Sequence, residues 1–266
     1  MYDFHLHSEF SMDCKYLMEE MVKASINKNM KSICFTDHID YEVGEDKIDM
    51  DFRTQDYFRN VKKTKYKYMK DIEVLAGVEI GMQPHLANRY NELILNNPFD
   101  FVIMSIHAID GMDIHFDNFT HGKLPIDAIT EYYNYMYQCI LNFNNFDVLG
   151  HIDYIDRYFE DFSMLPDFKE YSCTVENILK LIIEKGKGLE INTAGKRYGL
   201  DYYHPKTQIL KLYKKLGGEI ITIGSDSHSP KYIGYDYRLV EKMLKEIGFK
   251  YIYIFKERKK YPIHIS

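Results

Sequence analysis

Short apolar runs alternate with longer amphipathic segments from one end of the chain to the other. Runs rich in Val, Ile, Phe and Tyr are typical of buried strands, and we expect strands over 2–7, 32–37, 72–80, 101–106, 147–151, 188–192, 219–225 and 251–255. Between them, segments with apolar residues every three to four positions predict helices over 17–28, 54–70, 86–95, 126–143, 171–185, 205–216 and 237–247. In 171–185, for example, one helical face carries Val175, Ile178, Leu179 and Ile182.

This alternation of strand and helix favours parallel βαβ units. With roughly eight such units, a closed or nearly closed β/α barrel is favoured over an open sheet. The chain contains no linker rich in Pro or Gly, no low-complexity segment and no internal repeat, so residues 1–266 are expected to form a single domain. The longest interruptions, 41–52 and 108–124, follow expected strands and are candidates for the rim of a pocket.

Composition narrows the class of protein. At 266 residues, with 45% hydrophobic and 28% charged residues, the chain can form a globular protein with a substantial core. The net charge of −6 argues against a nucleic-acid partner, because phosphate backbones are bound mainly by basic surfaces. The sequence has neither a signal peptide nor an apolar stretch of membrane-spanning length, so the expected location is the cytoplasm, with no membrane partner. We expect free thiols in a reducing compartment for Cys14, Cys34, Cys139 and Cys173, which include no C-x-x-C pair.

Two pairs of residues near opposite ends of the chain suggest a metal site. His5 and His7 close the first expected strand, and residues i and i+2 of a strand lie on one face, so both imidazoles can bind one ion. Asp226 and His228 repeat this spacing at the end of the strand expected over 219–225. One such pair is weak evidence, but two pairs that both close strands indicate a single site built from both ends of the chain.

Further candidate ligands occupy equivalent places. His38, Glu79, His107 and His151 each lie at or just after the end of an expected strand. In a parallel barrel these strand ends meet on one face, where active sites form. A single histidine is usually a hydrogen-bonded core or surface residue, but six of the eleven histidines follow this pattern. So many imidazoles and carboxylates exceed the four ligands of a structural zinc site and suit two or three ions.

The remaining charged features carry no functional prediction. Loop, helix-start and tail positions predict surface locations for His85, His115, His121 and His264. The basic runs over 62–70 and 256–260 are interpreted as solvated faces. The sequence contains no Gly-rich phosphate loop, no G-x-S-x-G motif and no cysteine-based nucleophile motif.

In this order, the motifs resemble those of the polymerase and histidinol phosphatase (PHP) superfamily of metal-dependent phosphoesterases. The resemblance rests on His5-Leu6-His7-Ser8, Phe35-Thr36-Asp37-His38, the lone His107 and Asp226-Ser227-His228. It covers essentially the whole chain and implies a distorted (β/α)7 barrel, similar to a TIM barrel, with a trinuclear metal centre. The segments 150–153 and 189–197 look most like the branch of the superfamily that hydrolyses histidinol phosphate.

The resemblance implies ligands for three divalent ions, for which Zn, Mn and Fe are all suitable. The three expected ligand sets are His5, His7, Glu79 and Asp226; Glu79, His107 and His151; and Asp13, His38 and His228. Asp13 is a departure, because many relatives carry a histidine there. A carboxylate can still ligate, with a different affinity or metal preference at the third position.

The resemblance also implies the chemistry. A metal-activated hydroxide would attack a phosphate monoester, with Glu79 and Asp226 bridging ions. His228 and a metal-bound water are both candidates to protonate the leaving alcohol. Arg157 and Arg197 match the phosphate-binding arginines of the family, with a surface salt bridge as the alternative for each. The expected substrate is the small molecule L-histidinol phosphate, cleaved to L-histidinol and phosphate in histidine biosynthesis, and the sequence leaves the oligomeric state open.

Three other interpretations remain. The protein could be a PHP phosphoesterase for nucleotides, oligonucleotide ends or phosphotyrosine, or a non-catalytic, metal-bound PHP module. The third is an amidohydrolase with a two-metal barrel, which shares the early His-x-His and the late Asp. Such enzymes usually carry a bridging lysine, and this chain has no lysine at a corresponding strand end.

Overall fold

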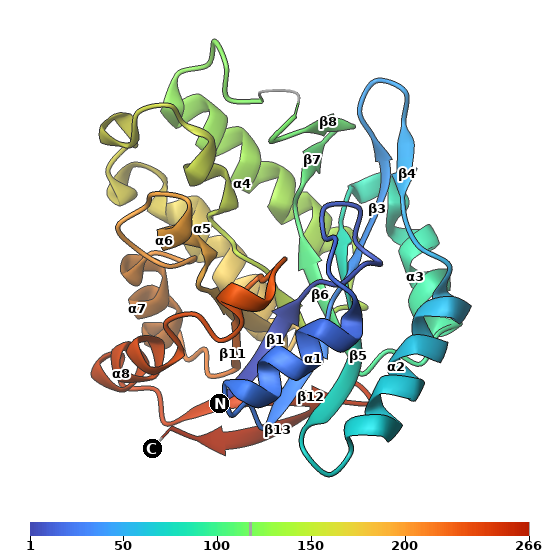
Figure 1. Ribbon diagram of the computed structural model, residues 1–266. Coiled ribbons are helices and arrows are strands. Elements are labelled where there is room, and N and C mark those ends of the chain that lie inside the picture. Colours follow the sequence, from blue (N-terminus) through green and yellow to red (C-terminus); the bar gives the residue numbers. More distant parts are fainter. Residues whose placement is uncertain (117–118, 266) are drawn as a thin grey trace.

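A nearly closed barrel of seven parallel strands forms the centre of the molecule in the computed structural model, which describes residues 1–116 and 119–265 (Figure 1). In sheet order the strands are β1 (Tyr2–Leu6), β2 (Ser32–Phe35), β5 (Glu73–Gly81), β6 (Phe101–Ser105), β9 (Val148–Leu149), β10 (Gly188–Asn192) and β11 (Ile221–Gly224). The first and last strands meet through a parallel bridge between Leu6 and Ser227. The backbone N–H of His7 also donates to the carbonyl of Ser227 at 3.1 Å. The predicted β/α barrel is confirmed.

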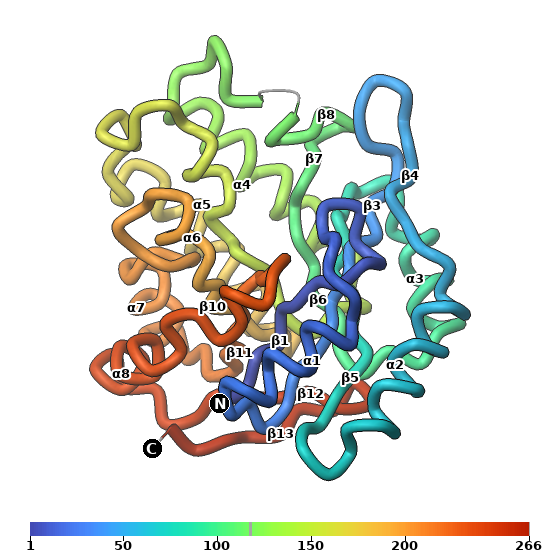
Figure 2. Tube along the Cα trace, in the orientation of Figure 1, coloured from blue at the N-terminus to red at the C-terminus, as the bar shows by residue number. Residues whose placement is uncertain are grey.

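Helices lie around this barrel, as the ribbon and the tube show in one orientation (Figures 1 and 2). All seven predicted helices are present, with ends that differ by up to three residues. They are α1 (Met18–Asn27), α2 (Thr54–Tyr68), α3 (Ala87–Leu95), α4 (Pro125–Asn142), α5 (Phe168–Glu184), α7 (Thr207–Lys215) and α8 (Tyr237–Ile247). The structure also contains short helical segments: η1 (Pro84–Leu86), η2 (Tyr154–Tyr158), η3 (Phe162–Met164), α6 (Ala194–Arg197) and η4 (Pro230–Tyr232). Within the described ranges, none of the helices combines the length and apolar character needed to cross a membrane.

The strand predicted over 251–255 lies outside the barrel, which corrects the expectation of about eight units. It is β12 (Tyr251–Lys256), and it pairs antiparallel with β13 (Lys259–His264). The turn at Glu257 and Arg258, both with positive φ, reverses the chain at once, whereas a parallel strand needs a long crossover. The hairpin contributes Ile254 and Phe255 to a small apolar cluster with the buried residues Phe4, Cys34, Leu75, Phe101, Ile103, Val148 and Ile220 of the barrel.

Two segments expected as loops contain β-hairpins. The segment 41–52 holds most of the hairpin of β3 (His38–Val43) and β4 (Ile48–Met50), and β3 also runs parallel to the end of β5. The segment 108–124 begins with the hairpin of β7 (Ala108–Ile109) and β8 (Met112–Asp113), and its positions 117 and 118 lie outside the described residues. Both hairpins stand at the upper end of the molecule in Figure 1, opposite β12 and β13. Three of these four strands, β4, β7 and β8, are only two or three residues long, which is too short to show an alternating pattern.

Candidate metal centre

The nine expected metal ligands converge at the carboxyl ends of the barrel strands. His5 and His7 end β1, Glu79 lies near the end of β5, and Asp226 and His228 follow β11. The other four ligands follow or begin neighbouring strands and loops, and they are Asp13, His38, His107 and His151. All except His5 and His7, which lie fully buried beneath, line one cavity of about 700 Å³.

Glu79 occupies the middle of this cluster. Its Oε2 lies 2.9 Å from Nε2 of His5 and 3.2 Å from Nδ1 of His38. Its Oε1 lies 2.8 Å from Nε2 of His151 and 3.3 Å from Nε2 of His107. Burial alone raises the pKa of Glu79, but the surrounding imidazoles outweigh it and hold the pKa well below its usual range. The two oxygens thus face separate sets of imidazoles, as those of a carboxylate that bridges two ions do.

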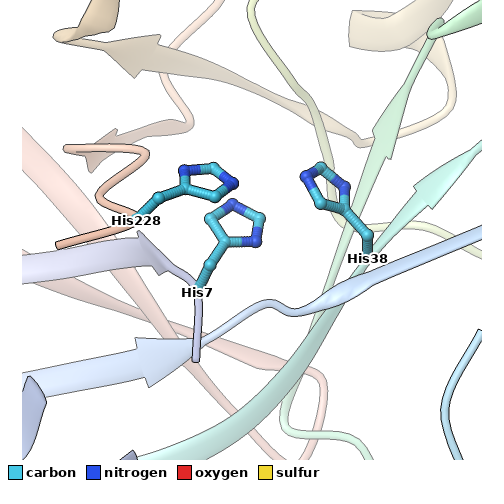
Figure 3. Close-up of side chains that lie close together, drawn as sticks. All are labelled: His7, His38 and His228. Carbon is cyan, nitrogen blue, oxygen red and sulfur yellow. The ribbon is translucent and has the colours of Figure 1, made fainter. Parts of the chain in front are cut away.

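A third group of side chains lies beside Glu79. Figure 3 shows the rings of His7 and His228 close together and the ring of His38 facing them. The ring centroids are 3.9 Å apart for His7 and His228, and 4.3 Å apart for His7 and His38. The Oδ2 atom of Asp13 lies 2.9 Å from Nε2 of His228 and 3.8 Å from Nε2 of His38. The residue that departs from the family pattern therefore borders the two histidines with which the family resemblance grouped it.

The chemistry of these donors fits divalent ions. Counting partners within the described chain, Nε2 of His7 and Nδ1 of His38 are buried and make no hydrogen bond. A buried polar atom without a partner is costly, and an ion would satisfy such nitrogens. Imidazole nitrogens and carboxylate oxygens together suit Zn, Mn or Fe.

Supporting contacts orient the imidazoles, and the sequence analysis did not identify them. Nδ1 of His5 donates to Oε1 of the buried Glu190 at 2.6 Å, and Nδ1 of His107 donates to Oδ2 of Asp40 at 3.0 Å. Each contact leaves Nε2 of the same ring turned toward Glu79. A sequence signal existed for Asp40, because His38 and Asp40 repeat the i, i+2 spacing of the two terminal pairs.

One buried histidine carries none of the expected roles. His204 was not among the sequence-based candidates, and its Nδ1 donates to Oδ1 of Asp153 at 2.7 Å, with its ring centroid 6.5 Å from that of His151. The predicted surface positions are confirmed for His85, His115, His121 and His264. One of these, His115, also lines the wall of the cavity.

The two candidate arginines lie in different surroundings. Arg157, on η2, lines the cavity and packs over the ring of Tyr154 at 4.0 Å. Arg197, on α6, is not part of the cavity lining formed by the described residues. Its Nη2 donates to the backbone carbonyls of Ser225 at 2.5 Å and Asp226 at 2.9 Å.

The backbone around Asp226 is under local constraint. Asp226 has a φ of 52°, in the left-handed region that residues with a side chain rarely adopt. Just before it, a Cβ at Gly224 would lie 2.3 Å from Cβ of His5 and 2.3 Å from Oε1 of Glu190, so only glycine fits there. The end of β11 is therefore shaped to bring Asp226 close to the imidazoles of β1.

Comparison with known proteins decides the family. Residues 3–194 match the PHP domain. The chain belongs to the PHP family. Within it, this PHP protein is 33% identical to a probable histidinol-phosphatase of Clostridium acetobutylicum over 98% of the chain and 99% of the relative. It is 31% identical to the histidinol-phosphatase of Lactococcus lactis over 93% of the chain and 91% of the relative.

A solved structure supports the same placement. The Lactococcus lactis histidinol phosphate phosphatase, crystallised with zinc, L-histidinol and phosphate, superposes with a TM-score of 0.89 at 29% identity and covers 98% of each chain. The putative histidinol phosphatase of Listeria monocytogenes shares the fold, with a TM-score of 0.74 at 23% identity. The PHP-type barrel expected from the sequence motifs is thus confirmed.

Proposed function

We propose that this PHP protein is a metal-dependent phosphomonoesterase that hydrolyses L-histidinol phosphate to L-histidinol and phosphate. The proposal is supported by similarity over nearly the full length to histidinol-phosphatases, one of which was crystallised with L-histidinol and phosphate. The observation that carries it for this chain is Glu79, whose two carboxylate oxygens face two sets of imidazoles within one cavity. We further propose that residues 1–266 act as one domain and that the protein works in the cytoplasm.

Three divalent ions are proposed for the centre, with the ligand sets expected from the sequence. When bound, the ions would activate water and neutralise the charge of the phosphate. Glu79 and Asp226 would hold two ions at a fixed spacing. His38 and His228 would complete the third position with Asp13, whose Oδ2 lies 2.9 Å from Nε2 of His228.

His228 was expected both to bind an ion and to act as a proton donor. Its Nε2 cannot do both at once, because an ion and a proton use the same lone pair. We assign this nitrogen to the third ion, since it faces Asp13. The leaving alcohol would then take its proton from water.

Phosphate would bind at the inner end of the cavity, next to the ions. Arg157 lines the cavity, and its Nη1 is buried without a hydrogen-bond partner among the described residues, so it is free to donate to a phosphate oxygen. We propose Arg157 as the phosphate ligand. Arg197 would support Asp226 through the two carbonyls that it holds.

The experiment that tests the function compares phosphate release from four substrates with metal analysis of the same preparation. The substrates are L-histidinol phosphate, a nucleoside monophosphate, a short oligonucleotide and a phosphotyrosine peptide. A preference for L-histidinol phosphate supports the proposal. A preference for another substrate would leave a phosphoesterase of different specificity, and metal binding without phosphate release would indicate a non-catalytic module.

A further inference from the structure

Gln83 lies just beyond the end of β5 and joins two hairpins that stand above the metal centre. Its side chain is fully buried. Nε2 donates to the carbonyls of Tyr41 at 2.9 Å and Glu42 at 3.2 Å, both on β3. Its Oε1 accepts from the backbone N–H of Gly111 at 2.8 Å, in the turn between β7 and β8. One amide group therefore bonds to both hairpins.

The position of Gln83 in the sheet explains these contacts. β5 is paired on one side with β3 and on the other with β6, whose chain continues into β7. Beyond Met82, whose N–H still donates to Ser105, the side chain of Gln83 takes over the bonds to both neighbours. Gln83 bonds to Glu42 and Gly111, whose φ values are 54° and 85°. This left-handed conformation is unfavourable for a residue with a Cβ, so the hydrogen bond from Gln83 helps to stabilise it at Glu42.

The two hairpins also contact each other. The backbone N–H of Gly44 donates to the carbonyl of Gly111 at 2.6 Å. A Cβ at Gly111 would lie 3.6 Å from the carbonyl oxygen of Glu42 and 3.7 Å from that of Gly44, which shows how closely the two turns pack. Gln83 and Gly44 therefore bond to the N–H and the carbonyl of the same residue, Gly111, and Gln83 also bonds to Tyr41 and Glu42.

Both hairpins contribute to the wall of the cavity. The first begins with the expected ligand His38 and with Asp40, and its second strand ends with Met50 and the following Asp51. The second contributes Asp113 and the residues that follow it, His115 and Phe116. This wall carries carboxylates, an imidazole and apolar surface, whereas the inner end of the cavity carries the metal ligands. A phosphate monoester with its phosphate at the ions would extend its alcohol part toward this wall.

We infer that Gln83 is a positioning residue that sets the affinity for the alcohol part of the substrate by holding the two hairpins at a fixed distance from each other and from the metal centre. This rests on the proposed function only for the identity of the alcohol, L-histidinol. The role requires an amide, because the contacts use two donor hydrogens and one acceptor from a neutral group. Neither an apolar side chain nor a carboxylate supplies that set.

The test measures the two halves of the substrate separately in Gln83→Met, which keeps the length of the side chain and removes its hydrogen bonds. We expect KM for L-histidinol phosphate and the inhibition constant of the product L-histidinol to rise together, by about tenfold or more, since about 1.4 kcal/mol corresponds to tenfold. The inhibition constant of inorganic phosphate should stay within about twofold of wild type, and the number of bound ions should not change. The matched control is Val175→Ala on α5, a buried substitution remote from the hairpins that lowers the unfolding temperature without changing KM.

Two results would overturn the inference. One is an unchanged KM and L-histidinol inhibition constant in Gln83→Met, and the other is a rise in the phosphate inhibition constant by the same factor. If this variant does not fold, amide hydrogen exchange in the wild-type protein decides, because the clamp requires slow exchange at Gly111 N–H, and exchange at the unfolded-chain rate would refute it. Failure of the wild-type protein to hydrolyse L-histidinol phosphate refutes the proposed function alone. The separate effects on binding of the alcohol and of phosphate can still be measured with whichever monoester the protein cleaves.

Discussion

The nitrogen that a histidine turns away from the metal centre matters as much as the one that faces it. Nδ1 of His5 donates to Glu190, and this contact holds Nε2 against Glu79. A carboxylate behind a ligating imidazole fixes its orientation and tautomer and raises its basicity. Glu190 therefore supports the metal centre by orienting His5, although it is not one of the expected ligands.

We predict that Glu190→Gln lowers the affinity for metal by about 10- to 100-fold while the barrel remains folded. The amide keeps the shape of the side chain and loses the charge that favours a bound cation. Metal content after dialysis against a weak chelator gives the readout. Glu184→Gln, at an exposed position near the end of α5, is the control and should bind metal as wild type does. Equal affinities in both variants would contradict the role of Glu190.

Asp13 allows a second residue-scale prediction. Because its Oδ2 borders His228 and His38, Asp13→Ala should lose one ion per chain and retain the two held around Glu79. Asp13→His, which restores the residue usual in relatives, should keep all three. Metal analysis of both variants, with the exposed Asp71→Ala as control, gives the answer. Three ions in Asp13→Ala would remove Asp13 from the ligand set.

At the scale of elements, η2 and α6 present their arginines differently. Arg157→Met should weaken inhibition by inorganic phosphate and leave the metal content unchanged, because its guanidinium lines the cavity. Arg197→Met should lower the metal content, since it releases the carbonyls of Ser225 and Asp226. Kinetics with phosphate as inhibitor, combined with metal analysis, separate the two. Weaker phosphate inhibition in Arg197→Met with full metal content would instead return phosphate binding to Arg197.

The hairpin of β12 and β13 serves stability and not chemistry. Phe255 is 4% exposed, and its ring centroid lies 5.0 Å from that of Phe101 at the amino-terminal end of the barrel. Phe255→Ala should cost about 3–5 kcal/mol of the free energy of unfolding, with kcat/KM unchanged. Tyr251→Ala, on the same strand at a position 42% exposed, should cost less than about 1 kcal/mol. Chemical denaturation measures both changes. Equal losses of unfolding free energy in the two variants would show that the packing of Phe255 against the barrel does not stabilise the fold.

At the scale of the whole molecule, the metal centre joins elements from both ends of the chain. Ions that bind the native state and not the unfolded chain stabilise the fold, by about 4 kcal/mol when free metal exceeds its Kd a thousandfold. Removal of metal with a chelator should therefore lower the unfolding temperature, and zinc should restore it. An unfolding temperature that does not change with metal would contradict the prediction that these residues bind ions.

Metal binding should also release protons in a pH-dependent way. Burial lowers the pKa of His5 and His107, but the carboxylates around them, Glu190, Glu79 and Asp40, outweigh it and raise both pKa values well above the usual range. In the metal-free protein these rings are thus protonated at about pH 7 and must lose protons to bind ions. As the pH rises through their pKa values, that release falls. Calorimetric titration with zinc in buffers of different ionisation enthalpy should show more protons released at low pH than at high pH.

Much of this protein follows from local sequence. The alternation of apolar runs and amphipathic segments determined the helices and the parallel strands, because both periodicities are properties of residues close together in the chain. The strand ends then predicted which side chains could share one face, which gave eight of the nine expected ligands, whereas Asp13 came only from the family resemblance. One exception, 251–255, has the composition of a strand, and only its immediate antiparallel partner excludes it from the barrel. Another is β3, which pairs parallel with β5 although no strand was expected there.

Tertiary structure alone decided what lies around those ligands. Glu190 is 185 residues from His5, and Gln83 bonds to residues on two different hairpins, so no local pattern could reveal either contact. The direction of Arg197 likewise depends on the left-handed turn at Asp226, which β1 and β11 impose together. Sequence periodicity thus specifies the elements and the chemistry at their ends. Which loops and side chains become neighbours is decided by the closure of the barrel, because closure brings distant segments into contact.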